Sequence, residues 1–422
     1  MAAKTPPKVD RATRPNPIGR FWRMGVLFVS ATLLLTGCWD RLEIEERAVV
    51  LGIGIDLVRS DTEKKEGDIS ELTGVFPAPT KDRLKLTVQV AIPGRIPLGP
   101  GEGGGSPTGA TKPVWVLSVV GHTLDDAISN LQQQIAGRLF FGHLRVIVIS
   151  KDVAQKDLSN ISDNLRRNPD VRRTNWMVVS EGKAEELMKT SPQLERVPSL
   201  YLLSTMDRAV QMGKLPNAFV GTFFSAGSAL GMEPFLPYVK LLENGVIQIS
   251  GLAYFRGERM VGHTEPLEIG AYMGIKGLEP GGYSVITQIP GSETAFMYQV
   301  THRNSRIDVA IKNGRPQFNV KVHNEGNLRE KTNEVTRLDT GVIRQIEKQL
   351  SETGYKAYEN LIKKTQEKSS DIFGFGEYVR AKEPKYWKEH IKTEDNWRKM
   401  YKDVEIHVQA QFNIRRIGGK TT

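Results

Sequence analysis

Residues 24–56 read MGVLFVSATLLLTGCWDRLEIEERAVVLGIGID, and this stretch leads from an apolar segment into the first predicted strand. Residues 24–36 are almost wholly apolar, but the run is shorter than the about 20 apolar residues that a membrane-spanning helix needs. Basic residues precede it, with Arg20 and Arg23 closest. A short apolar run behind basic residues is typical of a secretory signal peptide, so the sequence predicts one over residues 1–37.

The apolar segment ends in Leu35-Thr36-Gly37-Cys38, and Cys38 is the only cysteine of the chain. A small residue followed by a cysteine at this place looks like a lipobox. We therefore expect the Cys38 thiol to carry a diacylglyceryl group, to become the first mature residue and to bind membrane lipid. An ordinary signal peptide with an incidental cysteine is the alternative. A disulfide within the chain is excluded, since Cys38 has no second cysteine to pair with.

The composition is that of a folded protein with a mild positive charge. The chain is 39% apolar and 25% charged, and its formal net charge is +10. Residues 1–37 hold six Lys and Arg and one Asp, so half of the net charge belongs to the predicted signal peptide. The remaining excess suits a protein that lies beside anionic lipid headgroups. It gives little support to nucleic-acid binding, and no nucleic-acid partner is predicted.

Strand and helix patterns alternate between residues 49 and 189, which predicts an N-terminal mixed α/β domain over residues 38–190. Thr123 is expected to cap a helix, with Asp126 in a capping-box position and apolar residues on one face as far as Leu139. The glycine- and proline-rich residues 93–113 are expected to form a flexible loop. The other expected elements are strands at 49–56, 84–92, 114–120, 144–150 and 175–180 and helices at 158–167 and 183–189.

The rest of the chain predicts a small middle domain at residues 191–250 and a C-terminal α+β domain at residues 251–422. The middle domain is expected to hold a helix at 195–214 and strands at 238–242 and 245–249. In the last domain, Gly354 is expected to mark a kink or break in a long helix. Its expected elements are a hairpin at 252–262, strands at 282–289, 295–303, 305–312, 316–323 and 404–414, and the long helix at 339–368. The predicted fold class is α+β, with three mixed α/β domains and largely antiparallel sheets, lipid-anchored at the N-terminus.

Motifs for catalysis or metal binding are missing from the sequence. No two of the seven histidines have metal-ligand spacing, and no GxSxG, HExxH, phosphate-binding loop or calcium loop occurs. The GxG of residues 52–54 lacks the third glycine and the helix of a dinucleotide-binding fingerprint. We therefore expect no catalytic residue, no metal and no cofactor, and a protein that is not an enzyme.

Two other polar stretches are candidate sites. Glu325-Gly326-Asn327 could form a polar site, but a tight turn after a strand explains it better. Residues 378–402 mix basic and aromatic side chains and could contact lipid headgroups or a partner. A solvated helix face with its aromatic side chains in the core is the favoured interpretation.

The order of these motifs resembles that of the Ger(x)C family, the C-subunit lipoproteins of spore germinant receptors. The resemblance rests on the lipobox, the CWD sequence at residues 38–40 and the GIGID strand at residues 52–56. It continues in the residues that follow. These are FFGHLRVIVISKDVAQKDL at 140–158, GLAYF at 251–255, FNVKV at 318–322, EGNLRE at 325–330, DIFGFGE at 371–377, Trp387, Trp397 and the final strand.

The resemblance implies a lipoprotein subunit of a nutrient germinant receptor on the outer face of the cytoplasmic (spore inner) membrane. It implies assembly with a polytopic A subunit and a transporter-like B subunit, and nutrient-triggered germination. A lipid-anchored solute-binding protein of the cell envelope is the alternative, which would need a cleft between two similar lobes. A lipid-anchored hydrolase is a third class, for which no nucleophile–base pair is visible.

Overall fold

The computed structural model describes residues 46–58, 83–92, 113–190, 195–333 and 338–417, with the single positions Trp22 and Gly25. The chain forms two units, residues 1–47 and residues 48–422. Apart from those two positions, the expected signal peptide lies outside the described residues, as do Cys38 and most of the loop expected at 93–113. None of the described helices is long and apolar enough to cross a membrane.

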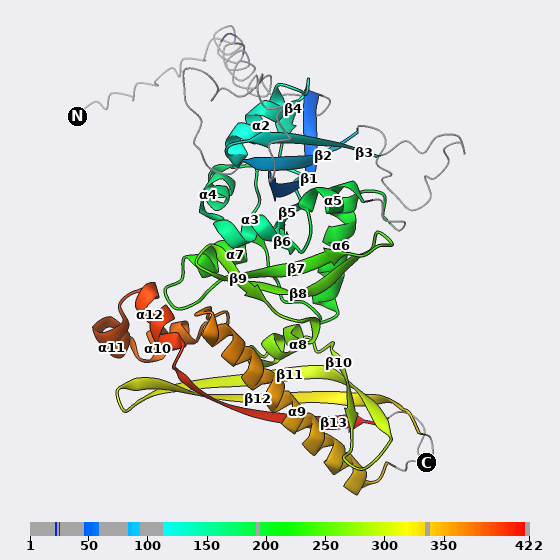
Figure 1. The fold of residues 1–422 in the computed structure, drawn as a ribbon, viewed down its shortest axis with the longest axis vertical. Helices are drawn as coiled ribbons and strands as arrows, with labels where there is room; N and C mark the ends of the chain where they lie inside the picture. Colours follow the sequence, from blue (N-terminus) through cyan, green and yellow to red (C-terminus); the bar gives the residue numbers. More distant parts are fainter. Residues whose placement is uncertain are drawn as a thin grey trace, which may run out of the picture. The chain divides into compact units, whose positions relative to one another are not determined.

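A nine-stranded mixed sheet occupies the N-terminal half of the described chain (Figure 1). Its order is β3-β2-β1-β5-β6-β7-β8-β9, and β4 pairs with β1. The central pairs β1–β5, β5–β6 and β6–β7 are parallel, and the flanking pairs along the order are antiparallel. The strands are β1 (Arg47–Leu57), β2 (Leu84–Ala91), β3 (Val114–Gly121), β4 (Arg138–Phe140), β5 (Val146–Ser150), β6 (Trp176–Ser180), β7 (Phe235–Leu241), β8 (Ile247–Arg256) and β9 (Arg259–His263).

Helices cover both faces of this sheet, because its central strands are apolar on both sides. All five residues of β5 are buried, and Ile147 and Val148 belong to different hydrophobic clusters on opposite faces. Figure 1 shows α2, α4 and α7 on one side and α5 and α6 on the other. The first group, with α3, is α2 (Leu124–Gln132), α3 (Lys151–Lys156), α4 (Ser159–Arg167) and α7 (Val220–Gly227); the second is α5 (Ala184–Lys189) and α6 (Pro198–Gln211).

The segment expected to be a small middle domain is part of this large sheet. Strand β7 pairs with β6, and β8 continues across the expected boundary at residue 250. The described residues 195–250 therefore extend the sheet that β1 begins, because β7 pairs with the edge of β6. The continuation of the sheet through β8 and β9 uses the predicted hairpin at 252–262.

A second, four-stranded sheet follows, built on a long hairpin (Figure 1). Its order is β10-β11-β12-β13, antiparallel except for the parallel pair β12–β13. Together the two sheets confirm a mixed fold with largely antiparallel pairing. The elements are α8 (Pro266–Ile275), β10 (Ser284–Gln288), β11 (Ala295–Lys312), β12 (Arg315–Lys331), α9 (Thr340–Glu367), α10 (Phe375–Lys382), α11 (Pro384–Tyr386), the π-helix η2 (Trp387–Ile391), α12 (Glu394–Tyr401) and β13 (Glu405–Arg416).

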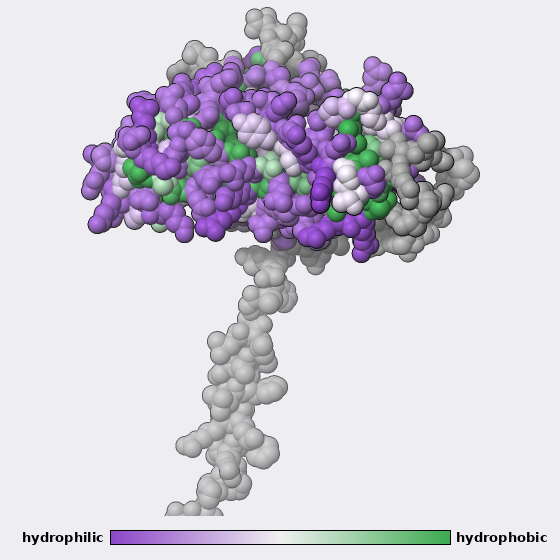
Figure 2. Space-filling view, turned by 90° about the horizontal axis from the view of Figure 1, so that it is seen from below, coloured by the Kyte–Doolittle hydropathy of each residue, from purple (hydrophilic) through white to green (hydrophobic). Residues whose placement is uncertain are grey.

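The helix α9 lies along the second sheet and shares its core. Ile346, Leu350 and Leu361 of α9 are buried in one cluster with Val408 and Phe412 of β13. The same cluster reaches Val148 in the first sheet, so one apolar core connects the two sheets. Seen from below, the surface is mostly hydrophilic with a few apolar areas (Figure 2).

Several predicted elements differ from the structure. Thr123 caps α2 as expected, but the helix ends at Gln132, and Leu139 lies in β4 instead. The two strands predicted between residues 295 and 312 are one strand, β11, because β12 pairs with it along its whole length. Helices α7 and α8 were not predicted.

Helix α9 is continuous through Gly354, so the expected break is wrong. A Cβ atom at Gly354 would lie 2.4 Å from Cε2 of Phe412. The glycine therefore lets the strand β13 approach the helix closely.

Candidate functional site

The GIGID segment of β1 is a packing site for two helices. A Cβ atom at Gly52 would lie 2.6 Å from Cβ of Ser199 in α6, and one at Gly54 would lie 2.9 Å from Cγ of Met188 in α5. Real Cβ atoms do not approach other atoms so closely, so only glycine fits at both positions. These glycines make room for α5 and α6.

Asp56 ends the GIGID segment and fastens α5 to it. Its carboxylate oxygens accept hydrogen bonds from the main-chain N–H groups of Ala184 and Glu185, at 2.8 and 2.9 Å. Burial raises the pKa of Asp56 above its ordinary value, while the two main-chain hydrogen bonds act in the opposite direction. The aspartate thus satisfies main-chain donors at the start of a helix.

A second buried aspartate, Asp371, organises the DIFGFGE segment. Its Oδ1 accepts from the main-chain N–H of Gly374, and its Oδ2 accepts from that of Gly376, each at 2.9 Å. The indole Nε1–H of Trp397 also donates to Oδ2, at 3.0 Å. Burial raises the pKa of Asp371 to about 6. The nearby ammonium group of Lys276, which donates to the carbonyl oxygen of Phe373 at 2.7 Å, lowers that pKa.

Polar contacts join the DIFGFGE segment and α12 to the loop before β7. The Oε1 atom of Glu377 accepts from the main-chain N–H of Gly231 at 2.9 Å. The guanidinium Nε of Arg398 in α12 lies 2.5 Å from Oε1 of Glu233, whose side chain is 3% exposed. Breaking a buried ion pair by removing one partner leaves the other charge uncompensated. These contacts therefore hold the C-terminal helices against the first sheet.

The Glu325-Gly326-Asn327 stretch lies within strand β12, so the expected tight turn is wrong. A Cβ atom at Gly326 would lie 2.2 Å from the carbonyl oxygen of Gln299 on the paired strand, where β11 has a bulge. Glu325 bonds Arg415 of β13, and this bond is the main reason that its pKa falls to about 2. The stretch is a cross-strand contact of the second sheet.

The basic and aromatic residues 378–402 divide as the favoured interpretation predicts. Trp387 and Trp397 are 4% and 2% exposed and belong to the core. Lys385, Lys388 and Lys399 are exposed. The aromatic side chains therefore hold the C-terminal helices in place, and the lysines face solvent.

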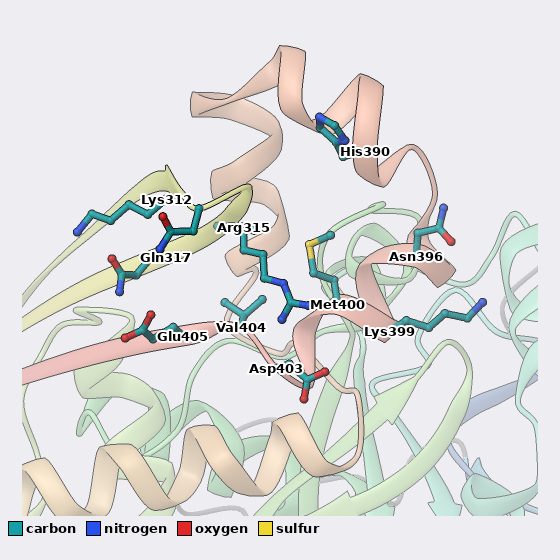
Figure 3. A pocket seen from close by; sticks show the side chains of 12 residues that line it. Lys312, Arg315, Gln317, His390, Asn396, Lys399, Met400, Asp403, Val404 and Glu405 are labelled. Atoms are coloured by element: carbon teal, nitrogen blue, oxygen red, sulfur yellow. The ribbon is translucent and has the colours of Figure 1, made fainter.

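An open cleft lies where the tip of the β11–β12 hairpin meets α12 and β13 (Figure 3). Its volume is about 690 Å³, with Lys312 and Arg315 on the hairpin side and Lys399 on α12. None of these three cations has an ion-pair partner among the described residues. Asp403 and Glu405 bring opposite charge to the same cleft. The cleft is thus a polar surface of mixed charge.

Metal-ligating side chains do not gather in the part of the chain that the structure describes. No group of three or more His, Cys, Asp or Glu side chains lies close enough together there to hold an ion. The predicted lipidation site, Cys38, lies outside the described residues.

Two protein families match adjoining parts of this chain. A family described as the spore germination protein N-terminal domain matches residues 40–241. Another, described as spore germination B3/GerAC like, C-terminal, matches residues 250–418. The two matches include both the GIGID and the DIFGFGE segments.

Similar proteins and one similar solved structure extend over most of the chain. Spore germination protein KC of Bacillus subtilis (strain 168) is 27% identical over 418 residues, which cover 94% of this chain and 95% of that protein. Spore germination protein A3 of the same organism is 25% identical over 398 residues, covering 92% and 96%. The crystal structure of the GerBC protein has a similar fold, with a TM-score of 0.51 and 16% identity over 86% of this chain and 97% of that chain. The chain belongs to the Ger(x)C family of spore germination proteins.

Proposed function

We propose that this chain is the lipoprotein subunit of a nutrient germinant receptor. The observation that carries the proposal is the match of two spore germination families to residues 40–241 and 250–418, in that order. Relatives with the names spore germination protein KC, A3 and B3 each cover at least 92% of this chain. The subunit assembles with a polytopic A subunit and a transporter-like B subunit, and nutrient binding by the complex triggers germination.

The subunit is held on the outer face of the spore's inner membrane through lipid on Cys38. The position of the cysteine supports this, because the family match begins at residue 40, two residues after it. Two or more acyl chains are enough for stable anchoring, since each buried methylene contributes about 0.8 kcal/mol. The protein is not an enzyme in this proposal and needs no cofactor.

Mass spectrometry of the mature N-terminus, with fatty-acid labelling, tests the anchor. We expect the wild-type chain to begin at a lipidated Cys38, and Cys38→Ala to remain an unlipidated precursor. Thr36→Ser keeps the acceptor thiol and serves as the matched control. Fractionation alone is insufficient, because the apolar residues 24–36 of the precursor can still hold it to membranes. A wild-type chain without lipid on Cys38 would contradict the anchor.

Affinity purification from solubilised spore inner membranes tests the assembly. We expect a tagged full-length chain to retain two membrane subunits, one polytopic and one transporter-like. Deletion of the gene for this chain should abolish the response to one nutrient and leave the response to other nutrients unchanged. A chain that purifies alone and binds a solute tightly would favour the solute-binding alternative.

A further inference from the structure

A mainly apolar cavity lies between α8, α9 and the second sheet. Its volume is about 180 Å³, and its walls include Val285, Val300, Leu350 and Phe412. Leu267 and Ile286 also line it and are 64% and 70% exposed, so its mouth is open to solvent and apolar. We call it the α8–α9 cavity. Cavities of this kind, mainly apolar with few polar groups, are typical of small-molecule sites.

The buried cation Arg303 lines this cavity. Its side chain comes from β11 and is 5% exposed. Its Nη1 donates to the carbonyl oxygens of Leu278 and Pro280, each at 3.0 Å, and its Nη2 donates to that of Gly213 at 3.1 Å. Burial lowers the pKa of this guanidinium, since the charge has lost most of its water.

No carboxylate bonds the Arg303 guanidinium among the described residues. The nearby Glu279 accepts from the main-chain N–H of Arg303 instead, at 2.7 Å. The Nε–H and one Nη2–H of Arg303 have no partner in the described part of the chain. These N–H donors are available to a bound carboxylate, and hydrogen bonds from a charged donor to a carboxylate are strong.

Two hydroxyl groups supply further polarity at the cavity. The Oγ1 atom of Thr287 is buried and has no hydrogen-bond partner among the described residues. The hydroxyl of Tyr358 accepts from Nδ2 of Asn324 at 2.9 Å, so its own proton remains available for donation. Buried polar groups without partners are costly, and a bound ligand that pairs with them recovers that cost.

We propose that the α8–α9 cavity binds a small carboxylate with a short apolar chain. The carboxylate accepts hydrogen bonds from the unpartnered N–H groups of Arg303, and the chain lies against the apolar walls. A cavity of about 150 Å³ holds benzene, so this one suits a ligand of about seven non-hydrogen atoms. The charge of the ligand compensates the buried guanidinium, which a neutral ligand of the same size does not do.

Isothermal calorimetry on the detergent-solubilised full-length chain tests this site, with 3-methylbutanoate as the probe. The matched neutral probe is 3-methylbutanol, which has the same carbon skeleton. We expect the acid to bind at least about tenfold more tightly than the alcohol, because hydrogen bonds between a guanidinium and a carboxylate are charge-assisted. Equal affinity of the two probes, or no binding of the acid, would overturn the proposal.

Three substitutions locate the site. Ala357→Phe on α9 fills the cavity and should abolish binding of 3-methylbutanoate, while Ala381→Phe on the exposed face of α10 should not change it. Thr287→Val removes a hydroxyl that is unpartnered in the free protein, so the melting temperature should not fall while the Kd rises several-fold. Arg303→Gln should abolish the preference for acid over alcohol; if it fails to fold, the other two variants still decide. Unchanged binding in Ala357→Phe would place the probe elsewhere and refute the site.

A partner protein that inserts an apolar side chain is the other possible occupant. If Ala357→Phe abolishes copurification with other receptor subunits and the wild-type chain does not bind 3-methylbutanoate, the cavity belongs to that partner. This outcome would overturn the ligand proposal and leave the proposed receptor function intact.

Discussion

The GIGID segment at residues 52–56 and the DIFGFG segment at residues 371–376 both combine glycines with a buried aspartate. In GIGID the glycines come first, and their missing side chains make room for α5 and α6. In DIFGFG the aspartate comes first, and the glycines supply the main-chain donors that it accepts. Gly374 also adopts a positive φ of 74°. The same residue types thus serve close packing in one segment and loop geometry in the other.

The two aspartates differ in the structure that depends on them. Asp56 binds the first turn of the short helix α5, which packs on the same sheet that contains Asp56. Asp371 holds a loop whose neighbours Glu377, Trp397 and Arg398 connect the C-terminal helices to the first sheet. Asp56 therefore caps one helix, whereas Asp371 stabilises the junction between the C-terminal helices and the first sheet. We expect substitution of Asp371 to lower the stability of the protein more than substitution of Asp56.

The largest effect is expected for Asp371→Ala. The substitution leaves three buried donors, the N–H groups of Gly374, Gly376 and the Trp397 indole, without an acceptor. We expect a loss of at least about 3 kcal/mol in the free energy of unfolding, since each of the three stranded donors costs about 1–3 kcal/mol. Urea titration followed by tryptophan fluorescence measures it. The exposed acid Glu389, changed to Gln, should shift the midpoint very little. Equal losses of unfolding free energy in Asp371→Ala and Glu389→Gln would contradict the stabilising role of Asp371.

The next effect is expected for Gly52→Ala. The new methyl group would lie 2.6 Å from Cβ of Ser199 and 2.8 Å from Cε of Met188, so α5 or α6 must shift. Overpacking of this kind costs about 1–3 kcal/mol. Gly182→Ala is the control, because the nearest atom to its new methyl group would be Oε2 of Glu186, 3.7 Å away at the end of a flexible side chain. Thermal unfolding followed by circular dichroism compares them, and an unshifted Gly52→Ala would contradict the packing role.

Gly374→Ala tests whether a glycine is needed for its backbone conformation or for close packing. Its nearest contact would be 3.4 Å from Sδ of Met232, so space is available and only the positive φ of 74° opposes a side chain. A left-handed conformation costs about 1–2 kcal/mol for a residue with a Cβ atom. Gly374→Asn should cost less than Gly374→Ala, because asparagine tolerates this conformation better. The reverse order in melting temperature would point to packing as the cause in both segments.

The smallest effect is expected from pH. The pKa of Asp371 is raised by burial to about 6 from an ordinary 3.8, so the folded chain holds this proton more tightly than the unfolded chain. The ionised carboxyl therefore costs stability at pH 7, and that cost falls as the pH drops through 6. We expect the stability difference between wild type and Asp371→Ala to grow by about 1 kcal/mol between pH 7 and pH 5. A difference that shrinks over this range would contradict the raised pKa. The other buried ionisable groups, Lys276, Glu233 and Asp56, are present in both proteins, so the comparison isolates the titration of Asp371.

The apolar patterns predicted most strands of the first sheet and the long helix, because burial dictates those residues directly. Helices α7 and α8 were not predicted, because neither has the local sequence pattern of an amphipathic helix. The α7 sequence VGTFFSAG holds few good helix formers, and the burial of Phe223 and Phe224 stabilises it instead. The α8 sequence PLEIGAYMGI is apolar nearly all round, so it shows no helical periodicity. Tertiary contacts decide both helices.

The contacts at the sites were less predictable than the elements. The lone Cys38 and the GIGID and DIFGFGE segments were visible in the sequence, but the partners of Asp56 are 128 and 129 residues away. Arg303 stands in the polar run THRNSR, which reads as solvent-exposed, and only the fold places it at 5% exposure. Long-range partners of this kind leave no local pattern in one sequence.

The parallel pairing of β13 with β12 sets the order in which the chain can complete its fold. The N-terminal end of β13, Glu405, pairs with Gln317, so α9 and the C-terminal helices must be made before this contact can form. Until then one edge of β12 has unpaired main-chain groups, and such edges recruit strands from other chains. The twelve residues of β13 are therefore the last part of the second sheet to be made. Chains that stop before residue 405 should accumulate as aggregates, even though the GIGID and DIFGFGE segments have already been made.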